Sequence, residues 1–236
     1  MGNHAHYQAH PRNHLQAAVV VTQDLNTPEK DTRPVAFFDF DGTLTTGDTL
    51  MPFLKYVVGA PTYYAKLALL SPVLAAYFLK LLRNDIAKQI VLKQYLAGYH
   101  IDELFELGKR FSEEVIPTML RPEGMERLRW HQEQGHECVL VSASLDIYLN
   151  IWTKGERFSD AICTSLKKLD DGSITGHIKG NNCYDEEKVK RIIAWLASKS
   201  PIEIYAYGDT SGDIPMIDFA NYGYIWLRKE GKFSSI

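Results

Sequence analysis

Two aspartates separated by one residue are the side chains in this sequence best suited to do chemistry. The stretch PVAFFDFDGTLTTGDT covers residues 34–49 and holds Asp39 and Asp41, both at the end of the apolar segment VAFFDF. Two like charges at the end of a buried strand are energetically costly unless a positive group lies beside them. A carboxylate in such a place can attack a phosphorus atom, and a second acid can move the proton that the reaction requires.

Polar residues of matching types recur where later apolar segments end. Ser142 lies in ECVLVSAS, Lys188 near the start of DEEKVKRIIAWLASKS, and Asp209 at the end of IEIYAYGD, with Asp213 shortly after it. In open α/β sheets, ligands bind beyond the carboxyl ends of the strands. We therefore expect these side chains to meet the two aspartates at one edge of a sheet.

Apolar segments alternate with amphipathic ones over most of the chain, which predicts an α/β fold with a Rossmann-like parallel sheet. A helical pattern containing several prolines interrupts the alternation after the first strand. We predict an α/β catalytic core at 34–49 and 118–236, a helical cap domain at 50–117, and a flexible N-terminal extension at 1–33. Strands are expected at 35–40, 137–144, 160–165, 202–209 and 222–227, a hairpin arm at 173–180, and helices at 123–135, 144–155 and 185–200.

Three acids that meet at one sheet edge, Asp39, Asp41 and Asp209, would repel one another strongly. A hard divalent cation removes this repulsion. Carboxylate and carbonyl oxygens with bound water suit Mg²⁺, whereas zinc favours histidine or cysteine. A cation held in this way usually takes a substrate phosphate as a further ligand. The carboxylates therefore predict a magnesium site that faces a phosphorylated substrate.

The positive side of this site would come from Lys188, in the first turn of its predicted helix. Its ammonium group can bind a phosphoryl oxygen, while Ser142 and the backbone amide of Ala143 donate to another. Each residue also has an ordinary structural interpretation: Lys188 as an exposed helix residue, Ser142 as a turn residue, Asp41-Gly42 as a turn, and Asp213 as a helix cap. The ordered set at strand ends favours the site over these separate interpretations.

The ordered motifs resemble the haloacid dehalogenase superfamily of phosphatases, most closely its phosphoserine-phosphatase-like subclass. The likeness is carried by DFDGTLT, the later lysine and GDTSGD, over about residues 34–228. It implies an enzyme, a phosphoric monoester hydrolase, with Asp39 as nucleophile and metal ligand and Asp41 as acid/base whose backbone carbonyl contacts Mg²⁺. It also implies that Thr43 supports the turn, that Ser142 and Lys188 hold the phosphate, that Asp209 is a metal carboxylate, and that Asp213 supports the metal site by orienting metal-bound water or Lys188.

The family likeness also bears on the substrate. A glutamate of phosphoserine phosphatases that meets the substrate amine is matched here by Asp48, which is also interpreted as a helix N-cap. Arg83 and Arg110 are the candidates for a carboxylate-binding arginine. The glycine expected shortly before the lysine is missing, and NCYDEEK has Tyr184 and Asp185 in its place. We predict a Mg²⁺-dependent phosphatase that hydrolyses a phosphate monoester of a small metabolite through an aspartyl-phosphate intermediate.

Two alternatives stay open. The first is a membrane-surface lipid phosphatase with a phosphatidylglycerophosphate-like substrate and the same chemistry. It is suggested by the cap segment, which is unusually apolar and aromatic, similar to lipid-phosphate members of the subclass. The other alternative is a non-catalytic protein that binds phosphorylated ligands. An assay of phosphate release separates it from both enzymes.

The composition argues against several other classes of protein. A net charge of -3 and a pI near 6.2, without a basic stripe, argue against a nucleic-acid partner. Three dispersed cysteines fit a cytoplasmic protein better than a disulfide framework or a zinc cluster. Ser71 and Pro72 interrupt the apolar stretch 63–82 between two lysines, so it is too short to span a bilayer but suits peripheral membrane contact. The histidines of the extension fit no defined metal site: His4, His6, His10 and His14.

Overall fold

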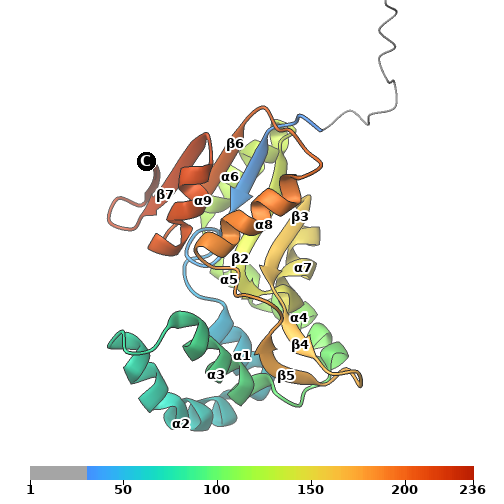
Figure 1. Ribbon diagram of the computed structural model, residues 1–236, viewed down its shortest axis with the longest axis vertical. Coiled ribbons are helices and arrows are strands. Elements are labelled where there is room, and N and C mark those ends of the chain that lie inside the picture. The colour runs from blue at the N-terminus through green and yellow to red at the C-terminus, as the bar shows by residue number, and fades with distance from the viewer. Residues whose placement is uncertain (1–30) are drawn as a thin grey trace, which may run out of the picture.

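The computed structural model describes residues 31–236, and within them one sheet of six strands is covered by helices on both faces (Figure 1). The predicted α/β class is confirmed. Of the extension predicted at 1–33, all but 31–33 lies outside the described residues, and so do its four histidines. From one edge of the sheet to the other, the strands are β3 (Asp160–Thr164), β2 (Glu137–Leu145), β1 (Val35–Phe38), β6 (Ile204–Gly208), β7 (Tyr222–Leu227) and β8 (Lys232–Ser235).

The sheet is mostly parallel, with β1 in its middle. β1 pairs in parallel with β2 and with β6, and β3 and β7 extend the parallel arrangement on either side. β8 runs antiparallel to β7 and closes one edge. The sequence did not predict β8, because KFSS is short and lacks the apolar run by which the other strands were recognised. Because β3, β2, β1, β6 and β7 all run parallel, their carboxyl ends lie at one edge of the sheet.

The two faces of the sheet are buried under different helices. α6 (Pro122–Glu133) and α7 (Asp146–Gly155) cover one face, and α8 (Glu186–Leu196) and α9 (Ile214–Phe219) cover the other. Successive residues of β1 alternate between the two faces. Ala36 and Phe38 join the hydrophobic cluster under α6 and α7, and Val35 and Phe37 join the cluster under α8 and α9. Burial on both faces explains why the strand is apolar at every position rather than at every second one.

The helical segment after the first strand lies at the carboxyl end of the sheet (Figure 1). It contains α1 (Leu50–Val58), α2 (Ala60–Phe78), α3 (Asn84–Leu96), α4 (Ile101–Glu114) and α5 (Ile116–Met119). α4 packs against α7 of the core, whereas a hairpin from the second half of the chain, β4 (Leu166–Lys168) and β5 (Ile174–Ile178), packs against α3. The division into a core and a cap at 50–117 stays a prediction.

The apolar stretch at 63–82 is mostly the helix α2. Pro72 lies inside it, Tyr63 and Leu70 are buried, and Leu69 and Phe78 are exposed. No helix in residues 31–236 combines the length and the apolar character that crossing a membrane would need.

The turn that leads into α8 is strained at Asp185. Its φ of 56° and ψ of -135° are angles that glycine adopts readily and other residues rarely. The backbone amide of Glu187 donates to the carbonyl of Tyr184 at 3.2 Å and closes the turn. A turn that favours glycine thus accounts for the glycine that the family likeness led us to expect here.

Replacing Asp185 with glycine is expected to stabilise the protein. Relief of backbone strain gains roughly 1–3 kcal/mol, and the greater freedom of glycine in the unfolded chain costs about 0.5–1 kcal/mol. We expect a net gain of about 1 kcal/mol in the free energy of unfolding, measured by urea denaturation. Asp185→Ala is the matched control, since it also removes the carboxylate but keeps the strain. If Asp185→Ala gains as much stability as Asp185→Gly, the gain comes from loss of the carboxylate charge and not from relief of backbone strain.

Candidate active site

The chain leaves the sheet directly after β1, at Asp39. The backbone amide of Asp39 still donates to the carbonyl of Tyr207 in β6 at 2.9 Å. Gly42 then adopts a φ of 84°, and a Cβ at this position would overlap the carboxylate of Asp209. This turn brings Asp41 into the same cavity as Asp39, although alternate residues of a straight strand would face opposite sides.

Lys188 lies between two carboxylates in the interior. Its Nζ is 2.6 Å from Asp39 Oδ1 and 2.6 Å from Asp213 Oδ1, and its side chain is 1% exposed. The hydroxyl of Thr43 donates to the second oxygen of Asp39 at 3.0 Å. Each oxygen of Asp39 therefore has its own partner, Lys188 from a distant part of the chain and Thr43 from the turn that follows the strand.

Asp213 is held equally firmly on its other side. Its Oδ2 accepts hydrogen bonds from the backbone amides of Asp209 and Thr210, at 3.2 and 3.0 Å, and from the Thr210 hydroxyl at 3.0 Å. This is a capping arrangement at the short 3₁₀ turn Ser211–Asp213. At the start of the following helix α9, however, Asp213 makes no side-chain capping bond, so its interpretation as the cap of that helix is wrong.

The acidic residues fit a divalent cation. One carboxylate oxygen from each of Asp39, Asp209 and Asp213 lies within 4.8 Å of the others. Asp209 Oδ1 is buried and has no hydrogen-bond partner among the described residues, which is costly for a carboxylate without a ligand. Because the donors are oxygens, the set suits Mg²⁺.

The pKa values of these groups indicate that the cluster holds more negative than positive charge. Burial and the neighbouring Asp213 raise the pKa of the Asp39 carboxyl to about 8. Burial also raises the pKa of Asp209. Burial would lower the pKa of Lys188, but the charges of Asp39 and Asp213 outweigh it and raise that pKa. One ammonium group therefore does not balance the carboxylates, and a divalent cation would favour their ionised forms.

Asp41 has a different environment from Asp39. Its Oδ1 accepts hydrogen bonds from the backbone amide and the hydroxyl of Thr49, at 2.8 and 2.6 Å, and its Oδ2 accepts one from Ser144. Burial and the nearby charge of Asp48 raise the pKa of Asp41 to about 6. A carboxyl group with such a pKa can both donate and accept a proton near neutral pH. Sequence reasoning missed Thr49 and Ser144, since neither belongs to a motif.

The carboxyl end of β2 borders the same cavity. Ser142 is buried, and its hydroxyl oxygen accepts a hydrogen bond from the backbone amide of Ser144 at 3.0 Å. The Ala143 carbonyl accepts from Lys88 of α3 at 2.5 Å, and the side-chain oxygen of Asn182 accepts from the same ammonium at 2.9 Å. Burial lowers the pKa of Lys88 to about 8. Lys88 was not predicted, because no motif marks it, yet it links the helical segment to the core.

A cavity of about 600 Å³ contains nearly all of the predicted site residues. Polar residues from the carboxyl ends of the strands line it together with apolar side chains of α1, α2 and α3. Asp48 borders the cavity and also accepts a hydrogen bond from the backbone amide of Met51 at 3.0 Å, so both interpretations of Asp48 are compatible with its position. The predicted site residues that line the cavity are Asp39, Asp41, Asp48, Ser142, Ala143, Lys188, Asp209 and Asp213.

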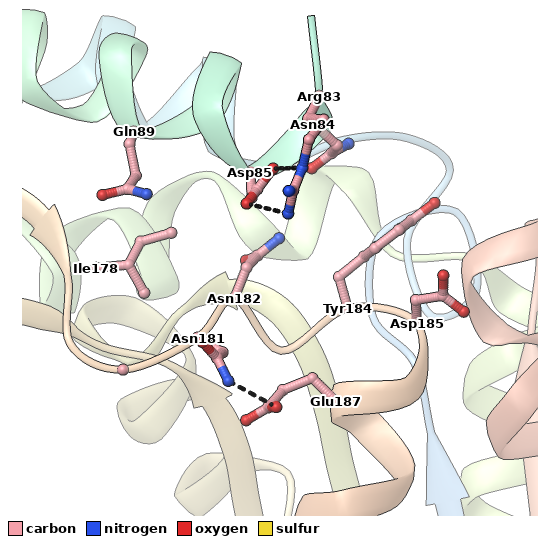
Figure 2. A pocket seen from close by; sticks show the side chains of 11 residues that line it. Arg83, Asn84, Asp85, Gln89, Ile178, Asn181, Asn182, Tyr184, Asp185 and Glu187 are labelled. Atoms are coloured by element: carbon pink, nitrogen blue, oxygen red, sulfur yellow. Dashed lines mark hydrogen bonds and ion pairs between the residues drawn. The ribbon is translucent and has the colours of Figure 1, made fainter.

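Figure 2 shows a second cavity, of about 460 Å³, between the start of α3 and the loop before α8. Asn84, Asn182 and Tyr184 border both cavities. Arg83 lies here, where its guanidinium pairs with Asp85 at 2.9 Å. Neither Arg83 nor Arg110 lines the larger cavity, so neither sequence candidate for a substrate-binding arginine lies with the site residues.

Comparison with known proteins connects this arrangement to a family. Residues 36–218 match the family model described as haloacid dehalogenase-like hydrolase. Protein CicA of Caulobacter vibrioides is 35% identical over 184 residues, which is 78% of this chain and 82% of CicA. Phosphoserine phosphatase SerB1 of Mycobacterium tuberculosis is 22% identical over 211 residues, covering 86% of this chain and 68% of that protein.

A solved structure has a similar fold. A Bordetella pertussis protein of unknown function superposes with a TM-score of 0.71 at 25% sequence identity, covering 82% of this chain and 89% of the other. The arrangement of sheet and helices described above is therefore shared over most of both chains.

Proposed function

The chain belongs to the haloacid dehalogenase-like hydrolases, and from this premise we propose that it is a Mg²⁺-dependent phosphatase acting on a phosphate monoester of a small metabolite. The observation that carries the proposal is the contact of Lys188 with both Asp39 and Asp213, beside the unpartnered oxygen of Asp209. This arrangement supplies a nucleophile, a cation and metal ligands in one place. A relative named phosphoserine phosphatase supports the phosphate-ester class.

The side chains can divide the reaction into two steps. Asp39 attacks phosphorus, so that a bond forms between its carboxylate oxygen and phosphorus while the bond to the alcohol oxygen breaks. Asp41 gives its proton to that leaving oxygen. Water then attacks the aspartyl-phosphate, Asp41 accepts the proton from water, and the bond between Asp39 and phosphorus breaks to release inorganic phosphate.

The other residues hold charge and position. Lys188 fixes one oxygen of Asp39 and offers its charge to a phosphoryl oxygen, as Ser142 and the backbone amide of Ala143 offer hydrogen bonds. Asp39, the backbone carbonyl of Asp41 and Asp209 would hold Mg²⁺, with Asp213 beside them. When bound, the ion would supply positive charge against the phosphoryl oxygens and the carboxylates.

The direct test is release of inorganic phosphate from a panel of phosphorylated metabolites, including phosphoserine and a glycerophospholipid phosphate, with Mg²⁺ or with EDTA. Spontaneous hydrolysis of phosphate monoesters is so slow that enzymes accelerate it by up to ~10²¹, so turnover is easily distinguished from background. The proposal requires release that depends on Mg²⁺. Binding of phosphorylated ligands without release from any ester would instead support the non-catalytic alternative.

A specific observation favours contact with a membrane surface as a second candidate function. Phe78, Leu79 and Leu81, at the end of α2, are 77%, 69% and 78% exposed, and Phe78 also borders the catalytic cavity. Lys80 lies among them, so an apolar and basic surface stands at the mouth of the site. Such a surface suits the interface of a bilayer that contains anionic lipid. A lipid-borne phosphate ester is the substrate that this contact would present.

We expect the protein to sediment with vesicles of phosphatidylglycerol and phosphatidylcholine, and the double variant Leu79→Asp/Leu81→Asp to remain in the supernatant. Two buried apolar side chains contribute about 1.5–3 kcal/mol each to such contact, so the loss should exceed tenfold in vesicle affinity. Ile202→Asp is the matched control, since Ile202 is 70% exposed and lies just before β6, at the amino ends of the parallel strands and away from the cavity. Wild-type protein that does not sediment, or equal losses in both variants, would rule out this surface.

A further inference from the structure

Asp209 differs from the other two carboxylates of the cluster in how it is held. Asp39 and Asp213 each contact Lys188 and a threonine hydroxyl. Within residues 31–236, the only hydrogen-bond partner of the Asp209 carboxylate is Arg228, whose Nη2 lies 2.9 Å from Oδ2. The orientation of this one carboxylate therefore depends on a residue outside the motif set.

Arg228 directly follows β7, the strand that pairs with β6 on the side away from β1. Its side chain is 71% exposed, whereas that of Asp209 is 1% exposed. The guanidinium thus reaches from the rim of the cavity to an almost fully buried carboxylate. An ordinary surface ion pair has both partners in solvent and little effect, but here one partner is fixed in the interior.

The turn after Asp41 lies against the Asp209 carboxylate as well. Gly42 lies so near that a Cβ there would overlap the carboxylate. Arg121 holds this turn, since its Nη2 donates to the Gly42 carbonyl at 3.1 Å and its guanidinium lies 4.1 Å from the ring centre of Trp226 in β7. Both the Gly42 turn and Arg228 therefore lie nearest to Oδ2, whereas Oδ1 is buried and has no hydrogen-bond partner among the described residues.

We propose that Arg228 is a positioning residue of the metal site, which holds Asp209 by Oδ2 so that Oδ1 is directed at the ion. The inference rests on the proposed Mg²⁺-dependent function. The positive charge of Arg228 also opposes a bound cation, but that charge is largely exposed and screened by solvent. Residues that orient metal ligands from outside the coordination sphere typically change metal affinity by about 10–100-fold when replaced. Orientation should therefore outweigh repulsion.

The test is the affinity of the full chain for Mg²⁺, measured by isothermal titration calorimetry, with Mn²⁺ and electron paramagnetic resonance as a second probe. We expect Arg228→Ala to weaken binding about tenfold or more. Arg228→Lys should recover part of the affinity, because the present contact uses one nitrogen. Lys229→Ala is the matched control, since Lys229 is the exposed neighbouring cation and is expected to change nothing.

The outcomes separate this inference from the proposed function. Unchanged or tighter Mg²⁺ binding by Arg228→Ala, in a protein whose wild type binds Mg²⁺ and releases phosphate, would overturn the role of Arg228 alone. Failure of the wild type to bind Mg²⁺ would overturn both. If Lys229→Ala loses as much affinity as Arg228→Ala, the effect is one of general surface charge and the positioning role is wrong.

Discussion

Asp39→Asn is expected to lower phosphate release by about 10⁴-fold or more while leaving the protein folded. An amide cannot form the covalent bond to phosphorus, so the first half of the reaction has no nucleophile. Asparagine has nearly the same shape as aspartate and can still accept from Lys188. Phosphate release under saturating substrate and Mg²⁺ gives the change in turnover, and circular dichroism reports the fold.

The same substitution should not weaken the fold in EDTA. Asp39 is buried beside Asp213, and both conditions raise the pKa of its carboxyl to about 8, so the ionised form is unfavourable there. A neutral side chain removes that cost, as often happens when a charged catalytic residue is replaced. Asp170→Asn, at an exposed position between β4 and β5, serves as the control. Wild-type turnover in Asp39→Asn would show that the nucleophile has been wrongly assigned.

Sequence patterns were sufficient where one element supplies both the structure and the chemistry. VAFFDF predicts a buried strand over 35–40; the observed strand ends two residues earlier, at Phe38, and Asp39 follows it at the edge where ligands bind. GDTSGD and the lysine of the preceding helix could be placed at the same edge because parallel strands bring their carboxyl ends together. The structure brings Lys188 within 2.6 Å of both Asp39 and Asp213, from positions far apart in the chain.

The residues that sequence patterns missed act through contacts between elements. Ser144 and Thr49 hold Asp41 from β2 and from the start of α1, and Arg228 reaches Asp209 from the end of β7. No spacing rule relates these partners, because each contact depends on how two distant elements pack. β4 and β8 were missed for a different reason: LKK and KFSS carry too few apolar residues to show a strand pattern.

The electrostatics of the site explain why its geometry depends on cations. Asp39 and Asp213 share one ammonium group, while Asp209 relies on an arginine at the rim. Buried like charges are tolerated only where paired charges or a metal compensate them. Lys188 is the internal part of that compensation, and the proposed Mg²⁺ is the external part. The two should therefore be partly interchangeable for stability but not for catalysis.

Lys188→Met tests this division, and it is expected to lower the free energy of unfolding in EDTA by about 3–5 kcal/mol, since it leaves two buried carboxylates without their partner. Methionine has a similar length and suits the buried position, so packing changes little. Turnover should fall by about 10³-fold, because a charge that stabilises the transition state is lost. Urea denaturation and phosphate release measure the two effects.

Two comparisons make the Lys188 result decisive. Lys190→Met, at an exposed position of the same helix, should change stability by less than about 0.5 kcal/mol. Adding Asp213→Asn to Lys188→Met should recover part of the lost stability, because one of the unpaired carboxylates is removed. Saturating Mg²⁺ should likewise recover part of the stability of Lys188→Met alone. Neither change restores the ammonium group, so turnover should stay low in both cases. If Lys188→Met is as stable as Lys190→Met, the carboxylates are not charged in the folded protein, and the proposed arrangement of charges around Mg²⁺ is wrong.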